Sequence, residues 1–128
     1  LVDEALGILE QLGLVGDAAN PVGQLPYGRQ RLVEIALALA CKPRVLLLDE
    51  PAAGVPAEDT ERVMAGVNAL GESLAVLLIE HDMEVVFRFA DVVSVLVDGA
   101  LLLTGTPDEV ARDERVKQVY LGERGAKR

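Results

Sequence analysis

The chain has 128 residues and a formal net charge of −9, a length that suits one domain able to bury a core. About half of the residues are hydrophobic but only 3% are aromatic, so the core must be aliphatic. The acidic balance argues against sequence-independent nucleic-acid binding and against adhesion to anionic lipid, because both need basic surfaces.

The first part of the chain is predicted to be helical. Leucines repeat along one side of residues 2–12, and Gly13 is a stop signal for that helix. Residues 16–24 contain Asp, Asn, Pro and Gly and are predicted to form a loop. A second helix is predicted over residues 29–40, and its single cysteine neighbour, Cys41, is interpreted as a buried structural thiol.

Two apolar runs without alternation follow, at residues 45–48 and 74–79. Such runs are typical of strands buried on both faces at the centre of a parallel sheet. Residues 56–70 between them are predicted to form a helix, with Pro56 and acidic residues at its start, where they suit the helix dipole.

The last part combines short elements. A helix over residues 83–90 and a strand over 91–97 lead to Asp98-Gly99, a strong hairpin signal, and the partner strand covers 100–104. Thr106 to Glu109 is a capping box that starts a helix to Arg112.

A final helix is predicted over residues 114–120, followed by a frayed end at 122–128. The acidic residues of these helices are interpreted as solvated faces. Together the elements predict an α/β fold with a mainly parallel sheet.

Polar side chains follow both predicted strands. Asp49 and Glu50 come directly after the first strand, and His81 follows the second. Open α/β sheets bind ligands at the carboxyl ends of their strands. One carboxylate there can hold Mg²⁺ beside a nucleotide, and the next can orient or deprotonate a water. An imidazole at the same edge can hydrogen-bond a γ-phosphate.

The order of these motifs resembles the ATP-binding subunit of ABC transporters. Residues 25–29, Leu-Pro-Tyr-Gly-Arg, match the signature motif, the strand ending in Asp49-Glu50 matches Walker B, and His81 matches the switch histidine. The segments Leu-Pro-Tyr-Gly, Glu-Pro-Ala-Ala-Gly, Ile-Glu-His-Asp-Met and, near the end, Val-Tyr-Leu-Gly-Glu are most similar to the branched-chain amino acid import subgroup.

The resemblance implies a role for each matching residue. The nucleotide-binding residues, here called the signature segment, are Leu25, Pro26, Tyr27, Gly28 and Arg29. The implied catalytic residues are Glu50 and His81, and the implied Mg²⁺ ligand is Asp49. The D-loop residues are Ala53, Gly54 and Val55. In this family the signature motif closes on ATP held by the opposite subunit, so it works only in a dimer.

Two positions depart from the family pattern. The signature is usually Leu-Ser-Gly-Gly-Gln, so Pro26 removes a hydroxyl and a backbone donor, while Arg29 adds a cation. Pro56 follows Val55 where the family usually has an acidic or amide residue, so the side chain that would couple two ATP sites is missing at this position.

The sequence contains no Gly-x-x-x-x-Gly-Lys-Ser/Thr, the Walker A loop that holds the β- and γ-phosphates, and it begins without methionine. The predicted fold is therefore an incomplete P-loop NTPase core of the ABC ATPase type, lacking the Walker A region. Residues 1–42 are expected to be the end of the helical subdomain with the signature motif. Residues 43–128 are expected to be the carboxyl-terminal part of the ATPase core with a terminal hairpin and helices.

The resemblance implies an ATP- and Mg²⁺-dependent ATPase subunit of an importer for branched-chain or related amino acids. Its implied partners are a second ATP-binding subunit, in a homo- or heterodimer, and transmembrane permease subunits, with no nucleic acid and no direct contact with the cargo. It would lie in the cytoplasm, peripheral on the inner face of the cell membrane. The chain alone is expected to be inactive. A non-catalytic interaction fragment and a non-transport ABC-type ATPase remain alternatives.

Overall fold

The computed structural model describes residues 2–71 and 74–126, including their side chains except those of 58 and 121–126. The chain divides into two compact units, Leu1–Ile79 and Glu80–Arg128, and each is described by itself. None of the helices in these described ranges is long and apolar enough to cross a membrane.

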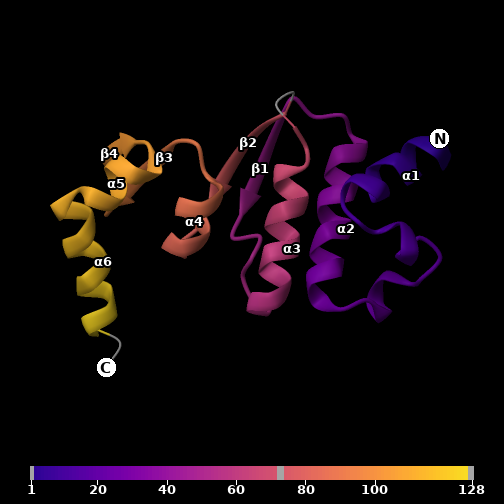
Figure 1. The fold of residues 1–128 in the computed structure, drawn as a ribbon, viewed down its shortest axis with the longest axis horizontal. Helices are drawn as coiled ribbons and strands as arrows, with labels where there is room; N and C mark the ends of the chain where they lie inside the picture. The colour runs from indigo at the N-terminus through magenta and orange to yellow at the C-terminus, as the bar shows by residue number, and fades with distance from the viewer. Residues whose placement is uncertain (1, 72–73, 127–128) are drawn as a thin grey trace. The chain divides into compact units, whose positions relative to one another are not determined.

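The first unit packs helices against a parallel pair of strands (Figure 1). Its elements are α1 (Val2–Gln11), the short 3₁₀ turns η1 (Val15–Asp17) and η2 (Val22–Gln24), α2 (Tyr27–Ala40), β1 (Val45–Asp49), α3 (Ala57–Asn68) and β2 (Ala75–Ile79). The two strands run in parallel with Asp49 opposite Ile79, so their carboxyl ends lie at one edge. The predicted strand–helix–strand order and parallel pairing are thereby confirmed.

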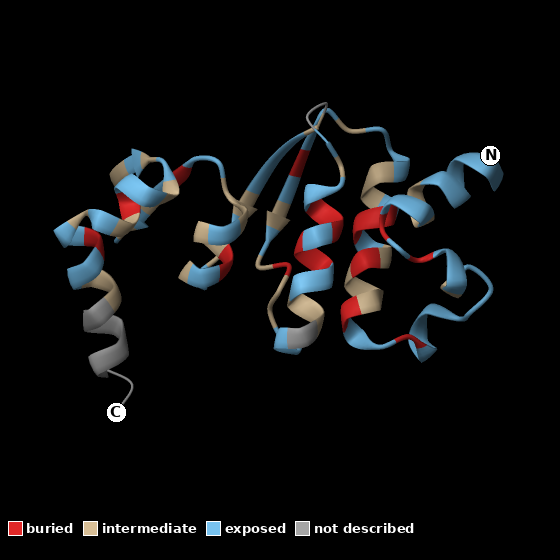
Figure 2. Ribbon diagram, in the orientation of Figure 1, coloured by how far each residue is buried: buried red, intermediate tan, exposed pale blue. Residues whose placement is uncertain are grey.

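An aliphatic core joins the helices to β1, and it appears in red along the facing sides of α2 and α3 in Figure 2. Its buried residues are Leu12, Leu14, Leu32, Ile35, Ala36, Leu46, Val63 and Val67. These residues lie on both sides of Lys42-Pro43. The core therefore crosses the subdomain boundary predicted at residue 42, and the compact units do not divide there. The assignment of residues 1–42 to a helical subdomain stays a prediction.

The prediction that both strands are buried on two faces is wrong for this structure. Along β1 the exposure alternates: Leu46 is 5% exposed, whereas Val45 and Leu47 are 55% and 69% exposed. On β2, Leu77 and Ile79 are each 57% exposed. The physical reason is that helices of the described chain cover one face of the two-stranded sheet, and the outward side chains have no layer against them.

Cys41 is also exposed, which contradicts its interpretation as a buried thiol. It is the residue that caps the end of α2, and the next residue, Lys42, turns the chain at a positive φ of 52°. Because the helix end projects from the core, its thiol meets solvent and approaches the Leu37 carbonyl at 3.7 Å.

The second unit contains α4 (Met83–Phe89), the hairpin β3 (Val93–Val97) and β4 (Ala100–Gly105), α5 (Pro107–Arg112) and α6 (Glu114–Ala126). The strands pair antiparallel around Asp98-Gly99, as the hairpin signal predicts. A small core of Val93, Val110 and Val116 holds the hairpin against α5 and α6.

The capping box at the start of α5 is confirmed. The Thr106 hydroxyl accepts from the Glu109 amide at 3.3 Å, and the Glu109 carboxylate accepts from the Thr106 amide at 2.8 Å. This backbone hydrogen bond lowers the pKa of Glu109 below its ordinary value. At the next helix start, hydrogen bonds from the Arg115 side chain lower the pKa of Asp113 to about 2. These two acids are bound to their own helix starts, rather than being only solvated.

Several element boundaries differ from the predictions. Helix α2 begins at Tyr27 instead of residue 29, because the Pro26 carbonyl accepts hydrogen bonds from both Arg29 and Gln30. The predicted loop at 16–24 includes the turns η1 and η2. Helix α6 continues to Ala126, where a frayed end is predicted from residue 122. Residues 127–128 lie outside the described residues.

Gly66 on α3 provides a test of how closely the helices pack. A Cβ built there would lie 2.9 Å from Leu32 Cδ2 and 3.2 Å from Leu12 Cδ2, both in the core. We expect Gly66→Ala to be less stable than the Gly7→Ala control by about 1–3 kcal/mol, because both helices gain from alanine but only at Gly66 must the core shift. Gly7→Ala is the matched control in helix α1, with nothing within 4 Å, and should stabilise by about 0.5–1 kcal/mol. Urea unfolding measures both, and equal effects would contradict the packing argument.

Candidate nucleotide site

The carboxyl end of β1 is tied to the carboxyl end of β2. The Glu50 amide donates to the Ile79 carbonyl at 2.8 Å, one residue beyond the regular strand pairing. Glu50 adopts a positive φ of 44°, and its carbonyl then accepts from the Ala53 amide at 2.9 Å. The chain therefore turns sharply at Glu50, so that Asp49 and Glu50 both sit at the ligand edge of the sheet.

Asp49 is exposed at this edge, whereas Pro51 directly after the turn is buried. Among the described residues, no group of three or more His, Cys, Asp or Glu side chains could hold a metal ion. A single carboxylate still fits Mg²⁺, because this ion commonly uses one or two protein carboxylates with waters and substrate phosphates. The geometry suits an ion shared with a nucleotide, rather than a cage built by protein alone.

His81 lies in the second unit, two residues after the end of β2. It is exposed and precedes Asp82, whose carboxylate caps α4 by accepting from the Glu84 amide at 2.9 Å. Asp49 and Glu50 thus lie at the end of β1 in the first unit, and the role that the resemblance implies for His81 stays a prediction.

The signature segment begins with a buried anchor and continues into a helix. Leu25 is 8% exposed, and its carbonyl accepts from the Gln30 side chain at 2.8 Å. Pro26 caps α2 without any side-chain hydrogen bond, and Tyr27 and Gly28 form the first turn. Tyr27 is 43% exposed, and the Arg31 guanidinium lies 5.2 Å from the centre of its ring. Within the segment Leu25 and Gly28 are therefore buried, whereas Pro26 and Tyr27 are exposed to solvent.

The signature segment packs directly on the D-loop and on the start of α3. A Cβ built on Gly28 would lie 2.8 Å from Asp59 Cβ and 3.4 Å from Val55 Cγ1, so only glycine fits there. A Cβ on Gly54, whose φ is 72°, would lie 3.6 Å from the Tyr27 ring. The signature segment and the D-loop, about 25 residues apart in the chain, are therefore in contact in the structure. The motif resemblance does not predict this contact.

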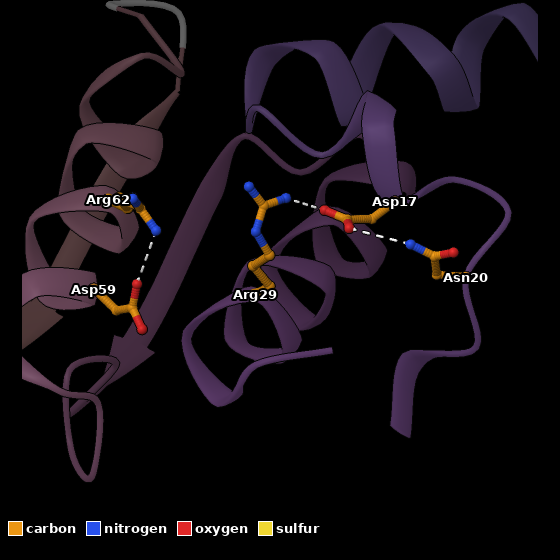
Figure 3. Close-up of polar contacts among 5 residues, drawn as sticks. All are labelled: Asp17, Asn20, Arg29, Asp59 and Arg62. Carbon is orange, nitrogen blue, oxygen red and sulfur yellow. Dashed lines mark hydrogen bonds and ion pairs between the residues drawn. The ribbon is translucent and has the colours of Figure 1, made fainter. Parts of the chain in front are cut away.

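The charges beside this contact are paired. The Arg62 guanidinium donates to the Asp59 carboxylate at 3.1 Å, and the Arg29 guanidinium is bonded to the Asp17 carboxylate (Figure 3). The Asp59 side chain is only 19% exposed, because Gly28 and Arg62 cover it. The sequence does not reveal the contact of Asp17 with Arg29, since nothing in the spacing of 12 residues links them.

Comparisons with known proteins agree with these motifs. The ABC transporter family model matches residues 2–53, and the model of the branched-chain amino acid ATP-binding cassette transporter matches residues 100–126. The chain is 41% identical over 117 residues to the high-affinity branched-chain amino acid transport ATP-binding protein BraF of Pseudomonas aeruginosa, covering 90% of the chain and 46% of that protein. It is 38% identical over 124 residues to LivG of Salmonella typhimurium, covering 95% and 49%.

Among solved structures, the chain is similar to the ADP conformation of an ATP-binding cassette of an ABC transporter. The TM-score is 0.84 with 31% identity, over 94% of this chain and 50% of that one. The chain thus spans about half the length of the curated relatives it matches. The motif order, the fold and these matches agree: the chain matches the ABC transporter family model over residues 2–53 and is similar over most of its length to ATP-binding proteins of branched-chain amino acid transport.

Proposed function

We propose that this chain is the carboxyl-terminal part of an ATP-hydrolysing subunit of an ABC importer for branched-chain or related amino acids. The observation that carries the proposal is the hydrogen bond from the Glu50 amide to the Ile79 carbonyl, which joins the ends of two parallel strands. It presents Asp49 and Glu50 at the edge where α/β sheets bind nucleotides. The cargo class is proposed from the names of the relatives, which are branched-chain amino acid transport proteins.

In this proposal the residues divide the work. When bound, Mg-ATP would supply the γ-phosphate for transfer to water. Asp49 would hold the metal, directly or through water, and Glu50 would orient the attacking water and accept its proton. His81 would donate a hydrogen bond toward the γ-phosphate. The 128 residues contain no Walker A loop, so that loop would come from elsewhere in the intact subunit.

The working assembly is proposed to be a dimer, homo- or heteromeric, in which the signature segment of one subunit faces ATP held by the other. Permease subunits in the membrane would convert dimer closure into transport, with this subunit peripheral on the cytoplasmic face. No nucleic acid and no cargo would contact it. The helical part up to residue 42 would belong to the subdomain that carries the signature segment, and residues 43–128 to the ATPase core.

Substitutions at the three proposed active-site residues test the chemistry in the full-length subunit. Glu50→Gln keeps shape but removes basicity, so it should lower turnover by roughly 10²–10⁴-fold while ATP binding persists. His81→Ala should also lower turnover with little loss of nucleotide affinity. Asp49→Asn should instead change the Mg²⁺ dependence. Steady-state ATPase assays and nucleotide titrations over a range of Mg²⁺ separate these results.

The matched control for these variants is Glu84→Gln, an exposed carboxylate on α4 near His81 in the chain, which should retain parental turnover. Near-parental turnover of Glu50→Gln would remove the general-base assignment. The same result for His81→Ala would make that histidine structural.

Pro26 gives a second test, because it stands where the family has serine. In the full-length subunit, Pro26→Ser should strengthen ATP-dependent dimerisation by about 1.5–3 kcal/mol, through a hydrogen bond to a charged phosphate. Pro26→Ala restores the amide donor but not the hydroxyl and should gain less. Sedimentation at a series of ATP concentrations measures dimerisation. Thermal unfolding without nucleotide separates the added cap on α2, worth about 1 kcal/mol, from the nucleotide effect. Weaker dimerisation of Pro26→Ser would mean that the backbone itself requires proline.

Gly28 tests the packing of the signature segment on the D-loop. Gly28→Ala places a methyl group against the Cβ of Asp59, close to the backbone of α3, where a small side-chain rotation gives no relief. We expect a loss of about 1–3 kcal/mol in unfolding free energy and faster amide exchange at Gly54. Gly23→Ala, with nothing within 4 Å, is the control and should change neither measurement. Identical behaviour of the two variants would refute the close contact.

A further inference from the structure

The Arg29 guanidinium is held within its own subunit. Arg29 is the third residue of α2, and its guanidinium is bonded to the carboxylate of Asp17 at the end of η1 (Figure 3). The other oxygen of that carboxylate accepts from the Asn20 amide group at 3.4 Å. Both oxygens of Asp17 are thus used within the connection that leads from η1 to the signature segment.

Electrostatics favour this pair. A cation in the first turn of a helix is disfavoured by the positive end of the helix dipole. Helix α2 has no acidic residue in its first turn, and its cap, Pro26, makes no side-chain hydrogen bond. Asp17 supplies the missing negative charge from outside the helix. Its side chain is 17% exposed and that of Arg29 is 34% exposed, so the pair is less screened than an ordinary surface pair.

The pair also closes the loop before the signature segment. Residues 18–24 contain no buried side chain, and the next anchor is Leu25, whose carbonyl is bonded to Gln30. Asp17 therefore attaches the start of this loop to the beginning of α2, and the hydrogen bond between Leu25 and Gln30 attaches its end to the same part of the helix. If the pair were lost, only Leu25 and the turns η1 and η2 would still restrain the loop.

We propose that Asp17 and Arg29 are positioning residues, so that Arg29 orients the signature segment and is not a ligand of the nucleotide phosphate. A phosphate that recruited Arg29 would have to break an ion pair whose carboxylate is already mostly buried. The proposal refines the nucleotide-binding role that the resemblance implies for Arg29, and it rests on the function proposed above. Nucleotide contact is left to the backbone and side chains of the other signature residues.

The test compares Asp17→Asn, Arg29→Gln, the double variant and the charge exchange Asp17→Arg with Arg29→Asp, all in the full-length subunit. If both residues position the segment, each single variant should raise the half-saturating ATP concentration about two- to fivefold, with turnover at saturating ATP near parental. The double variant should equal the single ones, because they remove the same interaction. Asp17→Arg alone should also raise the half-saturating ATP concentration, and the charge exchange should return it to the parental value.

The opposite pattern would overturn the proposal. If Arg29 binds phosphate, Arg29→Gln should weaken ATP use, whereas Asp17→Asn should leave it unchanged or improve it by releasing the guanidinium. Additive effects, no effect of either single variant, or a failed charge exchange would also overturn it. Lys117→Gln, which breaks the exposed pair with Glu114 on α6, is the control and should leave the half-saturating ATP concentration unchanged.

A second measurement separates this proposal from the proposed function. Amide exchange over residues 18–26 in nucleotide-free protein should be faster in Asp17→Asn and Arg29→Gln and parental in Lys117→Gln. This result depends on the pair and not on ATP. If the parental protein shows no ATP-dependent turnover, the proposed function is rejected. If amide exchange of the loop is unchanged in Asp17→Asn and Arg29→Gln, the positioning role is rejected.

Discussion

The contact between Gly28 and the start of α3 is the constraint on which the candidate site depends. Because Gly28 has no side chain, the first turn of α2 can approach Asp59 and Val55 closely enough for Tyr27 to lie against Gly54. The D-loop is thereby held between the signature segment on one side and the sharp turn at Glu50 on the other. Two stretches of the sequence, residues 25–29 and 49–55, thereby form one packed surface because Gly28 has no side chain.

This arrangement has a mechanical meaning for a dimeric ATPase of the proposed kind. A force on the signature segment would reach the D-loop through van der Waals contact, and from Ala53 it would reach Glu50 through a backbone hydrogen bond of 2.9 Å. Packed contacts of this type transmit displacement because protein interiors resist compression. Closure on nucleotide and alignment of the proposed general base would then be parts of one movement within the first unit.

Local signals in the sequence were sufficient for much of the fold. The hairpin at Asp98-Gly99 and the capping box at Thr106 follow from short-range chemistry that needs no distant partner, and the apolar runs that form the two parallel strands are local signals as well. The exposure of Leu47 and of Cys41 could not be predicted this way, because it depends on which layers pack around a strand or helix end.

The same contrast between local signals and long-range packing applies to the candidate site. Asp49 and Glu50 were recognisable from the apolar run before them, since the end of a strand is a local property. The partner of Arg29 was not recognisable, because an ion pair between a 3₁₀ turn and a helix depends on how the intervening loop folds. The sequence identifies Gly28 only as part of the signature segment, because its close neighbour Asp59 belongs to another helix.

The left-handed backbone at Glu50 has a consequence for how such a chain would change under selection. A non-glycine residue at a φ of 44° costs about 1–2 kcal/mol relative to glycine, which adopts this region freely. Selection for heat resistance alone would therefore favour glycine or asparagine at this position, and either would remove the carboxylate. Stability and turnover are opposed at one residue, so variants that gain thermal tolerance by relaxing this turn would be expected to lose the proposed chemistry with it.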